Sequence, residues 1–474
     1  MELLSKADRF IKSMTEREPL EKKWIFGNET DDPLRFAFDA KRVIHPGIKG
    51  SALPKDRWDE TWKTLVGGSG YNGKKAAYVH IPFCSTRCLY CGFFQNYTNR
   101  ELEDAYIDRL IEDFKMNSGA PLINSHPFHA VYIGGGTPSD MSAANIKRLL
   151  LAINEFLPLA NDCEFTFEAR IHNFDDEKVH VCIEGGINRF SLGVQSFNTD
   201  IRRIIGRRES REKILERLQY IHGIDHAAVV IDLMYGLPLQ TMEIWEDDVM
   251  TLCSAGIDGG DLYQLNVYSD SKLNDAIAKG NIPPAAKTSE QAVMFKRGLE
   301  IMEMQRMKRL SICHWADGTR ERNFYNFLSK SGAVTVPFGA GAGGKIQGYT
   351  MFVDRDIRSY VQRIDRGEKP LMFMMAPPDG YELYYDIIGQ MEKGHINLSW
   401  VRARYGIDME EAFSALFNEW ARKGLVQMNG DYLDLTVAGQ FWYVNLTQAI
   451  LDCLVMLGGD NGYSLTVKSI AAQG

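Results

Sequence analysis

Six short apolar segments, rich in β-branched and aromatic residues, alternate with helical patterns through the middle of this chain. The alternation of strand, helix and strand predicts a parallel sheet, which right-handed crossovers curl into a full or partial barrel. Such a sheet carries its functional side chains where the strands end. The expected strands are residues 76–83, 130–135, 164–169, 189–194, 228–236 and 262–268. The helix after the second strand should be capped by Ser139 or Asp140.

The predicted fold class is therefore α/β, a partial (β/α)6 barrel at residues 73–285 with three flanking parts. Residues 1–72 form an N-terminal extension that ends in a Gly-rich connector. Residues 286–376 complete the barrel and cover the substrate. Residues 377–474 follow a Pro-Pro boundary and form a small helical, winged-helix-like module. Its segment 424–439 reads as two short strands joined by an Asn-Gly turn.

Composition and charge exclude several classes of function. The 474 residues are 45% hydrophobic and 24% charged, as in an ordinary globular protein, and the net charge of −8 offers no field to hold a nucleic acid. No apolar run approaches the roughly 20 residues of a membrane helix, and the N-terminus lacks the apolar stretch of a secretory signal. We expect a cytoplasmic protein with no nucleic acid or membrane partner.

Three of the eight cysteines, Cys84, Cys88 and Cys91, stand in a C-x3-C-x2-C spacing directly after the first strand. Three thiolates can hold three irons of a [4Fe-4S] cubane and leave the fourth iron open. A zinc site would need a fourth ligand, and the nearest candidate, His80, lies back in the strand. The remaining cysteines are dispersed among apolar neighbours and receive no role.

Four further motifs accompany the cysteines: YVHIPFC (78–84), GGGTP (134–138), GVQSFN (193–198) and DLMYGLP (232–238). Together they resemble the radical S-adenosylmethionine (SAM) superfamily, in the branch of the oxygen-independent coproporphyrinogen III oxidases. The resemblance implies that the open iron chelates SAM and that an electron from the cluster cleaves it. Cys84, Cys88 and Cys91 would then be both metal ligands and catalytic residues.

The same resemblance assigns the cofactor-binding positions. The run with Gly135, Gly136 and Thr137 lets backbone approach a ligand, Glu168 takes the amino group of SAM, and Tyr78 and Tyr90 flank the cluster loop. Three positions imply a second SAM molecule, namely Gln195, Arg207 and Asp232. Without the resemblance, these residues would be read as a tight turn, packed aromatics, a solvated arginine and a helix cap.

A subgroup is indicated by CGFFQN (91–96), EARI (168–171), the segment 189–213 and ICHWADGTRERNFYN (312–326). These resemble the haem-utilisation radical SAM proteins known as HutW and ChuW. The resemblance implies methylation and anaerobic opening of haem to the linear tetrapyrrole anaerobilin, with release of iron. It also implies a reduced flavodoxin or ferredoxin-type electron donor and downstream haem-utilisation proteins. A coproporphyrinogen III oxidase and a haem chaperone of the same branch remain alternatives.

Contacts to haem are the least determined part of the site. Arg170 and Arg322, with Arg207, are cations that could meet propionates, and His314 could contact haem because His ligates haem iron. A lone His is more often a polar group satisfied by its neighbours. These three residues, Arg170, Arg322 and His314, are the predicted substrate contacts.

Overall fold

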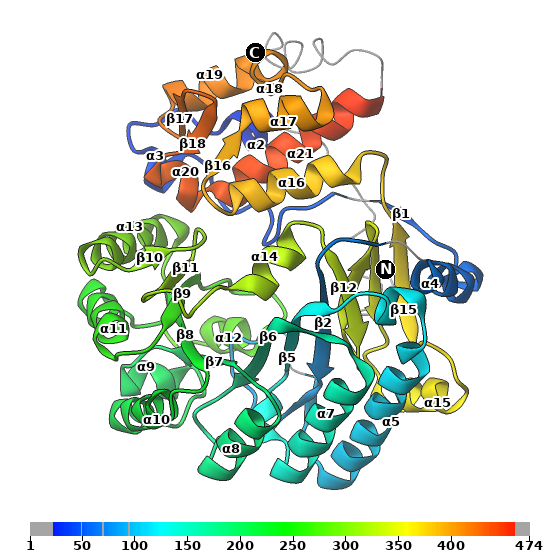
Figure 1. The fold of residues 1–474 in the computed structure, drawn as a ribbon. Helices are drawn as coiled ribbons and strands as arrows, with labels where there is room; N and C mark the ends of the chain where they lie inside the picture. The colour runs from blue at the N-terminus through cyan, green and yellow to red at the C-terminus, as the bar shows by residue number, and fades with distance from the viewer. Residues whose placement is uncertain (1–21, 49, 69–70, 93–94, 460–474) are drawn as a thin grey trace.

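The computed structural model describes residues 22–48, 50–68, 71–92 and 95–459 (Figure 1). Its largest element is a sheet of 13 strands whose centre is six neighbouring parallel strands. In sheet order these are β2 (Lys75–Ile81), β5 (Phe128–Gly135), β6 (Leu159–Ala169), β7 (Arg189–Gln195), β8 (Ala228–Tyr235) and β9 (Gly259–Gln264). All six predicted strands are present, which confirms the α/β class.

The sixth strand begins and ends earlier than predicted. The sequence favours 262–268, whereas β9 spans Gly259–Gln264. Its first residues, Gly259 and Gly260, pair with β11 on one side and β8 on the other. A Cβ on Gly259 would lie 2.3 Å from the carbonyl oxygen of Trp315. Glycine is needed for this close approach, so the apolar pattern alone misplaces the strand.

Helices connect the parallel strands and pack on their outer side (Figure 1). They are α5 (Arg100–Ser118), α7 (Ala143–Phe156), α8 (Asp176–Glu184), α9 (Thr199–Ile204), α10 (Arg211–Gly223) and α11 (Met242–Ser254). After the last parallel strand come α12 (Lys272–Ala278), which packs against Leu89 and Tyr90, and α13 (Thr288–Met304), which packs on α11. The predicted cap of α7 is wrong: Ser142, not Ser139 or Asp140, accepts a hydrogen bond from the Asn145 amide. Ser139 and Asp140 form the short turn η2 (Pro138–Asp140) instead.

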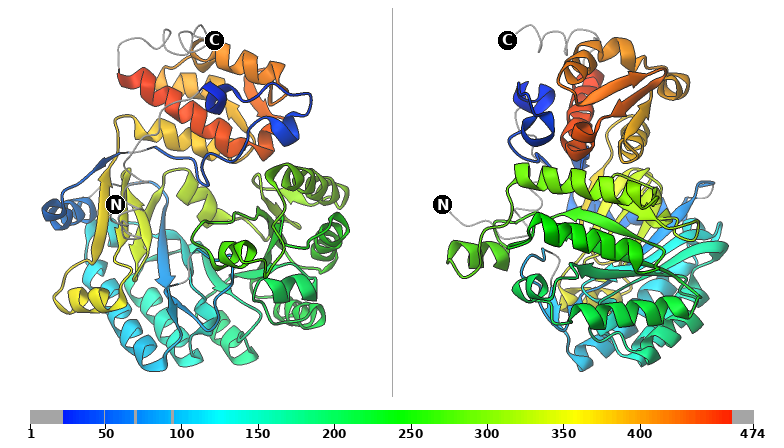
Figure 2. Two further views of the ribbon diagram at one scale, coloured as in Figure 1. Left: turned by 180° about the vertical axis from the view of Figure 1, so that it is seen from behind. Right: turned by 90° about the vertical axis from the view of Figure 1, so that its left-hand side faces the viewer.

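Both edges of the sheet are extended by later segments. At one edge β12 (Val334–Phe338) lies parallel to β2, followed by antiparallel β13 (Gly343–Ile346), β14 (Tyr349–Val353) and β15 (Leu371–Ala376). The short strand β1 (Ser51–Ala52) closes that edge. At the other edge lie β11 (His314–Ala316) and β10 (Lys308–Arg309). Figure 2 shows these two edges from behind. The helices η1 (Lys55–Arg57), α4 (Trp58–Gly67), α6 (Pro121–Asn124) and α15 (Ile357–Asp365) fill the periphery.

The C-terminal part forms a separate layer above the sheet in Figure 1. It contains α16 (Tyr381–Met391), α17 (Leu398–Tyr405), α18 (Met409–Ala412), α19 (Ser414–Arg422), α20 (Val437–Phe441) and α21 (Tyr443–Gly459), with β16 (His395–Asn397), β17 (Val426–Asn429) and β18 (Tyr432–Leu435). The predicted hairpin is confirmed, because β17 and β18 are antiparallel and turn at Gly430, whose φ is 58°.

The N-terminal residues are shared between two parts of the molecule. Helices α2 (Lys22–Phe26) and α3 (Pro33–Phe36) pack on the C-terminal layer, where the Trp420 indole donates to the Ile25 carbonyl at 2.8 Å. The strand β1 belongs instead to the large sheet. The division at residues 72, 285 and 376 stays a prediction.

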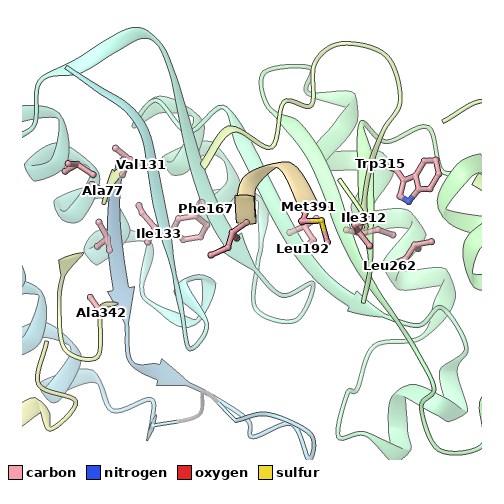
Figure 3. Close-up of a cluster of buried hydrophobic side chains, with 14 of the residues drawn as sticks. Ala77, Val131, Ile133, Phe167, Leu192, Leu262, Ile312, Trp315, Ala342 and Met391 are labelled. Atoms are coloured by element: carbon pink, nitrogen blue, oxygen red, sulfur yellow. The ribbon is translucent and has the colours of Figure 1, made fainter. Parts of the chain in front are cut away.

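The two faces of the parallel strands differ in polarity. Outward positions carry buried apolar side chains that meet the helices, including Val131, Ile133, Phe167 and Leu192 (Figure 3). Alternate positions point to the inner side and are often polar, because successive strand residues face opposite sides. The helix α14 (Phe324–Lys330) packs against β2, β5 and β12. No helix among the described residues is long and apolar enough to cross a bilayer.

Candidate active site

The three clustered cysteines lie just beyond the carboxyl end of β2. Cys84 ends the short strand β3 (Phe83–Cys84), which pairs with β4 (Asn96–Tyr97), and Cys88 and Cys91 follow in the loop. Cys84 and Cys88 are buried, whereas Cys91 is half-buried. Segments that follow four other strands hold this loop by hydrogen bonds. The Ser85 amide donates to the Asp140 carboxylate, and the Arg170 guanidinium donates to the Thr86 carbonyl. The Leu89 amide donates to the Ile205 carbonyl, and the Leu273 amide donates to the Leu89 carbonyl.

Hydrogen-bond donors and cations surround the thiols. The Thr137 hydroxyl lies 3.4 Å and the Arg170 guanidinium 3.7 Å from the Cys84 sulfur. Burial raises the pKa of Cys84 to about 11, against the opposing effect of Arg170. At Cys88 burial also raises the pKa, but Arg207 and Arg170 outweigh it and place the thiol pKa below its usual value. Cations and donors of this kind stabilise thiolate ligands.

The donor set fits a cubane better than a single ion. Among the described residues, no three or more His, Cys, Asp or Glu side chains are grouped to hold one metal ion. A zinc site requires such convergence on one point. A [4Fe-4S] cluster spreads its three thiolates over three different irons, which the loop from Cys84 to Cys91 can provide.

The glycine run at the end of β5 is hydrogen-bonded to the segment that leads to Cys84. The Gly136 and Thr137 amides donate to the carbonyls of Ile81 and Phe83, both at 2.7 Å. A Cβ on Gly136 would lie 2.4 Å from the Phe83 oxygen. Gly135 has a φ of 112°, and a Cβ there would lie 2.6 Å from the His80 ring. The close approach that these glycines allow is thus to the backbone and side chains of the strand that leads to Cys84.

Glu168 ends the neighbouring strand β6 and faces the inner side. It accepts hydrogen bonds from the Tyr132 hydroxyl at 2.6 Å and from the Gly135 amide at 3.1 Å. Burial raises its pKa. Tyr78 lies beside this pair, with its ring 6.2 Å from that of Tyr132 and its hydroxyl 3.1 Å from the His80 ring. The structure thus places Tyr78 and Glu168 on either side of Tyr132, next to the glycine run.

The three residues predicted for a second SAM meet around Gly193. A Cβ at Gly193 would lie 2.9 Å from the side-chain nitrogen Nε2 of Gln195 and 3.3 Å from the Arg207 guanidinium. Arg207 donates to the Gly193 carbonyl at 2.7 Å and to the Tyr90 hydroxyl at 2.9 Å. Asp232 is the register partner of Gly193 on β8. Burial, then Asp261 and Glu168, raise the Asp232 pKa to about 8.

Gln195 is held in an unusual backbone conformation. Its φ is 74°, and the pairing of β7 with β8 shifts register between Gly193 and Gln195. A positive φ is uncommon for a residue other than glycine, and such positions often mark functional sites. The irregular end of β7 turns the chain beside the cluster loop.

The predicted haem contacts are not brought together. Arg170 serves the cluster loop, where it binds Thr86 at 3.0 Å. Arg322 is exposed at the opposite, amino end of the strands, bonded to the Asp162 carbonyl at 2.9 Å. His314 is fully buried, with one ring nitrogen 2.7 Å from Asp261 and the other 2.9 Å from Glu321. Both ring nitrogens of His314 therefore face carboxylates, and the ring has no exposed surface.

Several inner-facing residues were missed from the sequence. The rings of Tyr132 and Tyr325 pack at a tilt of 30° with 4.5 Å between their centroids, next to Tyr78. Asp261 and Tyr263 follow on the inner side of β9, where Tyr263 keeps 38% of its surface exposed. A polar residue at every second position of an otherwise apolar strand was the signal that could have found them.

Comparison with known proteins identifies the family. The radical SAM superfamily profile matches residues 78–252. The anaerobilin synthase of Escherichia coli O157:H7 is 35% identical over 435 residues, covering 91% of this chain and 95% of that protein. The chain belongs to the radical SAM superfamily.

Within that superfamily, other relatives are also haem-related. The heme chaperone HemW of Bacillus subtilis is 26% identical, over 77% of this chain and 96% of its own. An oxygen-independent coproporphyrinogen III oxidase of Salmonella typhimurium is 24% identical, over 78% and 83%. The structure of coproporphyrinogen III oxidase (HemN) from Escherichia coli superposes with a TM-score of 0.74 over 86% of this chain and 96% of that one, at 20% identity. That likeness confirms the radical SAM fold.

Proposed function

We propose that this protein is a radical SAM methyltransferase that opens the haem macrocycle anaerobically to a linear tetrapyrrole, anaerobilin, and releases iron. The observation that carries the proposal is the 35% identity to an anaerobilin synthase over nearly the full length of both chains. The residue patterns of segments 189–213 and 312–326 support it, because they resemble the haem-utilisation group. A cytoplasmic location and a flavodoxin or ferredoxin-type electron donor belong to the same proposal.

The chain's own residues suit this chemistry. A reduced [4Fe-4S] cluster on Cys84, Cys88 and Cys91, with SAM on its open iron, supplies the radical cleavage. Glu168 offers a carboxylate for the SAM ammonium, and the burial of Cys84 and Cys88 limits the access of water to two of the three thiols. Gln195, Arg207 and Asp232 form a second polar group beside Gly193. We propose that this group holds a second SAM, which serves as methyl donor.

Two alternatives have specific support. A haem chaperone is suggested by the likeness to HemW over 77% of the chain. A coproporphyrinogen III oxidase is suggested by the 24% identity to the Salmonella enzyme. All three functions use the same three cysteines, so mutation of the cluster cannot separate them.

An anaerobic assay with reconstituted cluster, SAM, reductant and haem tests the proposal. We expect 5′-deoxyadenosine and S-adenosylhomocysteine together with a methylated linear tetrapyrrole. Decarboxylation of coproporphyrinogen with haem left intact would support the oxidase instead. Tight haem binding without SAM cleavage would support the chaperone. Omission of SAM is the control, and it should leave haem unchanged.

A further inference from the structure

A chain of four charged side chains runs through the inner side of the sheet, and none of the four is among the residues assigned above to the cluster or to SAM. The His314 ring lies between two carboxylates, with Nδ1 2.7 Å from Asp261 and Nε2 2.9 Å from Glu321. The second oxygen of Glu321 accepts from Arg189 at 2.8 Å. All four residues are buried, and His314 has no exposed surface. Burying so many charges is costly unless each is paired.

The neighbouring carboxylates favour the protonated form of the His314 imidazole. Burial alone lowers the pKa of His314, but Asp261 and Glu321 raise it to about 9. Burial raises the pKa of Glu321, yet Arg189 and His314 together bring it down to about 2. Glu321 therefore stays ionised at neutral pH. His314 is then an imidazolium ion-paired with Asp261 on its other side, and a proton can pass between them once Nδ1 and the carboxylate align in a hydrogen bond.

The chain ends at the inner side of the strands that carry the second polar group. Asp261 is the register partner of Asp232 on the adjacent strand β8, and Asp232 is the partner of Gly193. His314 is in turn the register partner of Asp261. Tyr263, two residues after Asp261 on the same side of β9, keeps 38% of its surface exposed. The proton carrier thus lies one strand away from Asp232.

The proposed reaction consumes protons. When a tetrapyrrole dianion gives up Fe²⁺, its nitrogens take up two protons and no electron moves. In a site from which water is excluded, a side chain must deliver them. Charged and titratable groups facing His314 are Asp261 from β9, Glu321 from the loop before α14, Arg189 from β7 and, one strand further, Asp232 from β8. Cys313 borders Asp261 at 3.8 Å.

We propose that His314, through Asp261, delivers the protons that replace iron on the tetrapyrrole nitrogens, while Glu321 and Arg189 position the imidazole. This inference rests on the proposed function. Each transfer breaks an imidazolium N–H bond and forms a pyrrole N–H bond, and uptake of a proton from water restores His314. Asp261 passes the proton, whereas Glu321 and Arg189 are positioning residues.

Two porphyrin substrates separate a proton-delivery role from a structural one. Haem must exchange iron for two protons, whereas metal-free protoporphyrin already carries both N–H groups. The variant is the double substitution Asp261→Asn with His314→Gln, which removes one buried anion and one buried cation together and so keeps the charge balance. The matched control is His222→Gln, since His222 lies on α10 with 35% of its side chain exposed, 3.7 Å from Asp258.

In the reconstituted holoenzyme we expect the double variant to release iron from haem roughly 100-fold more slowly, the lower range for a general acid. Opening of metal-free protoporphyrin should match the wild type, as should every rate of the control. In Glu321→Gln, loss of the anion that supports the imidazolium should shift the alkaline limit of iron release to lower pH.

Equal slowing of both porphyrins, or unchanged iron release from haem, would overturn the inference while the function stands. If wild-type protein leaves haem intact with SAM and reductant, the proposed function itself fails. A double variant that loses 5′-deoxyadenosine formation has lost the fold of the site, and Glu321→Gln then decides the question by its pH profile.

Discussion

At the scale of single residues, burial and charge act in opposite directions on the candidate ligands. The Cys88 thiol is buried, which disfavours its thiolate, yet Arg207 and Arg170 lower its pKa. Cys84 has Arg170 and Thr137 as donors, but burial outweighs them and its pKa is about 11. Iron coordination would favour the deprotonated form of both. Cys88 is therefore the thiol best prepared for ligation.

Replacing Cys88 with Ala should abolish cluster binding. One of the three thiolates is removed, and no fourth Cys stands close in sequence to replace it. Iron and sulfide content after reconstitution, with 5′-deoxyadenosine formation, measures the effect, and we expect both at background. Cys182→Ala is the control, because Cys182 is buried on α8 far along the chain. A Cys88 variant with full SAM cleavage would contradict the cluster assignment.

Asp232 predicts a pH dependence of stability. Its folded pKa of about 8 lies far above the ~3.9 of an unfolded chain. Between these values the folded protein keeps a proton that the unfolded chain has released, so stability contributed by this group is lost as pH rises towards 8. Asp232→Asn removes that loss. The Tm difference, variant minus wild type, should therefore increase from pH 5 to pH 8, and a constant difference would contradict the shifted pKa.

At the scale of elements, the segments that follow β5, β6, β7 and β9 each contribute one hydrogen-bonded support to the cluster loop. The short apolar, β-branched segments predict the strands and their order along the chain, and the Asn-Gly turn predicts the C-terminal hairpin. The start of α7 was misplaced by two or three residues, because Ser142, which lies after the short turn η2, is the residue that caps the helix locally. The bounds of β9 were misplaced because Gly259 acts through a tertiary contact with Trp315 that no local pattern shows. Which strand ends touch the loop depends on the curvature of the whole sheet.

Gly136→Ala tests the fastening of the cluster strand. Its Cβ would meet the Phe83 carbonyl oxygen at 2.4 Å, a backbone atom that cannot move aside alone. We expect a loss of about 1–3 kcal/mol in unfolding free energy, typical of overpacking, together with weaker cluster retention. Urea unfolding and iron content measure the two effects. Gly119→Ala is the control, since nothing lies within 4 Å of its Cβ position, and it should behave as wild type.

At the scale of the whole molecule, segments that are far apart in the sequence pack against one another. Helices α2 and α3 pack on the C-terminal layer, and the buried Trp442 indole donates to the Pro33 and Leu34 carbonyls, both at 3.0 Å. The same layer reaches the sheet through Glu392, which binds Lys330 at the end of α14 at 2.8 Å. The layer thus joins distant parts of the chain and covers the amino-end side of the strands, away from the cysteines.

Trp442→Ala should destabilise the molecule without altering the chemistry. Loss of a fully buried Trp costs about 3–5 kcal/mol in unfolding free energy. The activity of each folded molecule should be unchanged, because Trp442 lies in the C-terminal layer. Urea unfolding gives the first quantity and SAM cleavage per bound cluster the second. Trp400→Ala, at a side chain 38% exposed, should cost far less, and equal losses would contradict this packing.

The sequence by itself determined the α/β class, the six parallel strands and the cysteine loop, because strand periodicity and ligand spacing are local properties of the chain. Only the tertiary structure decided which side chains meet. His314, predicted as a haem contact, lies between Asp261 and Glu321, which are 53 and 7 positions away in sequence. Burial and pairing of charge are set by the packing of the whole sheet, and no local pattern encodes them.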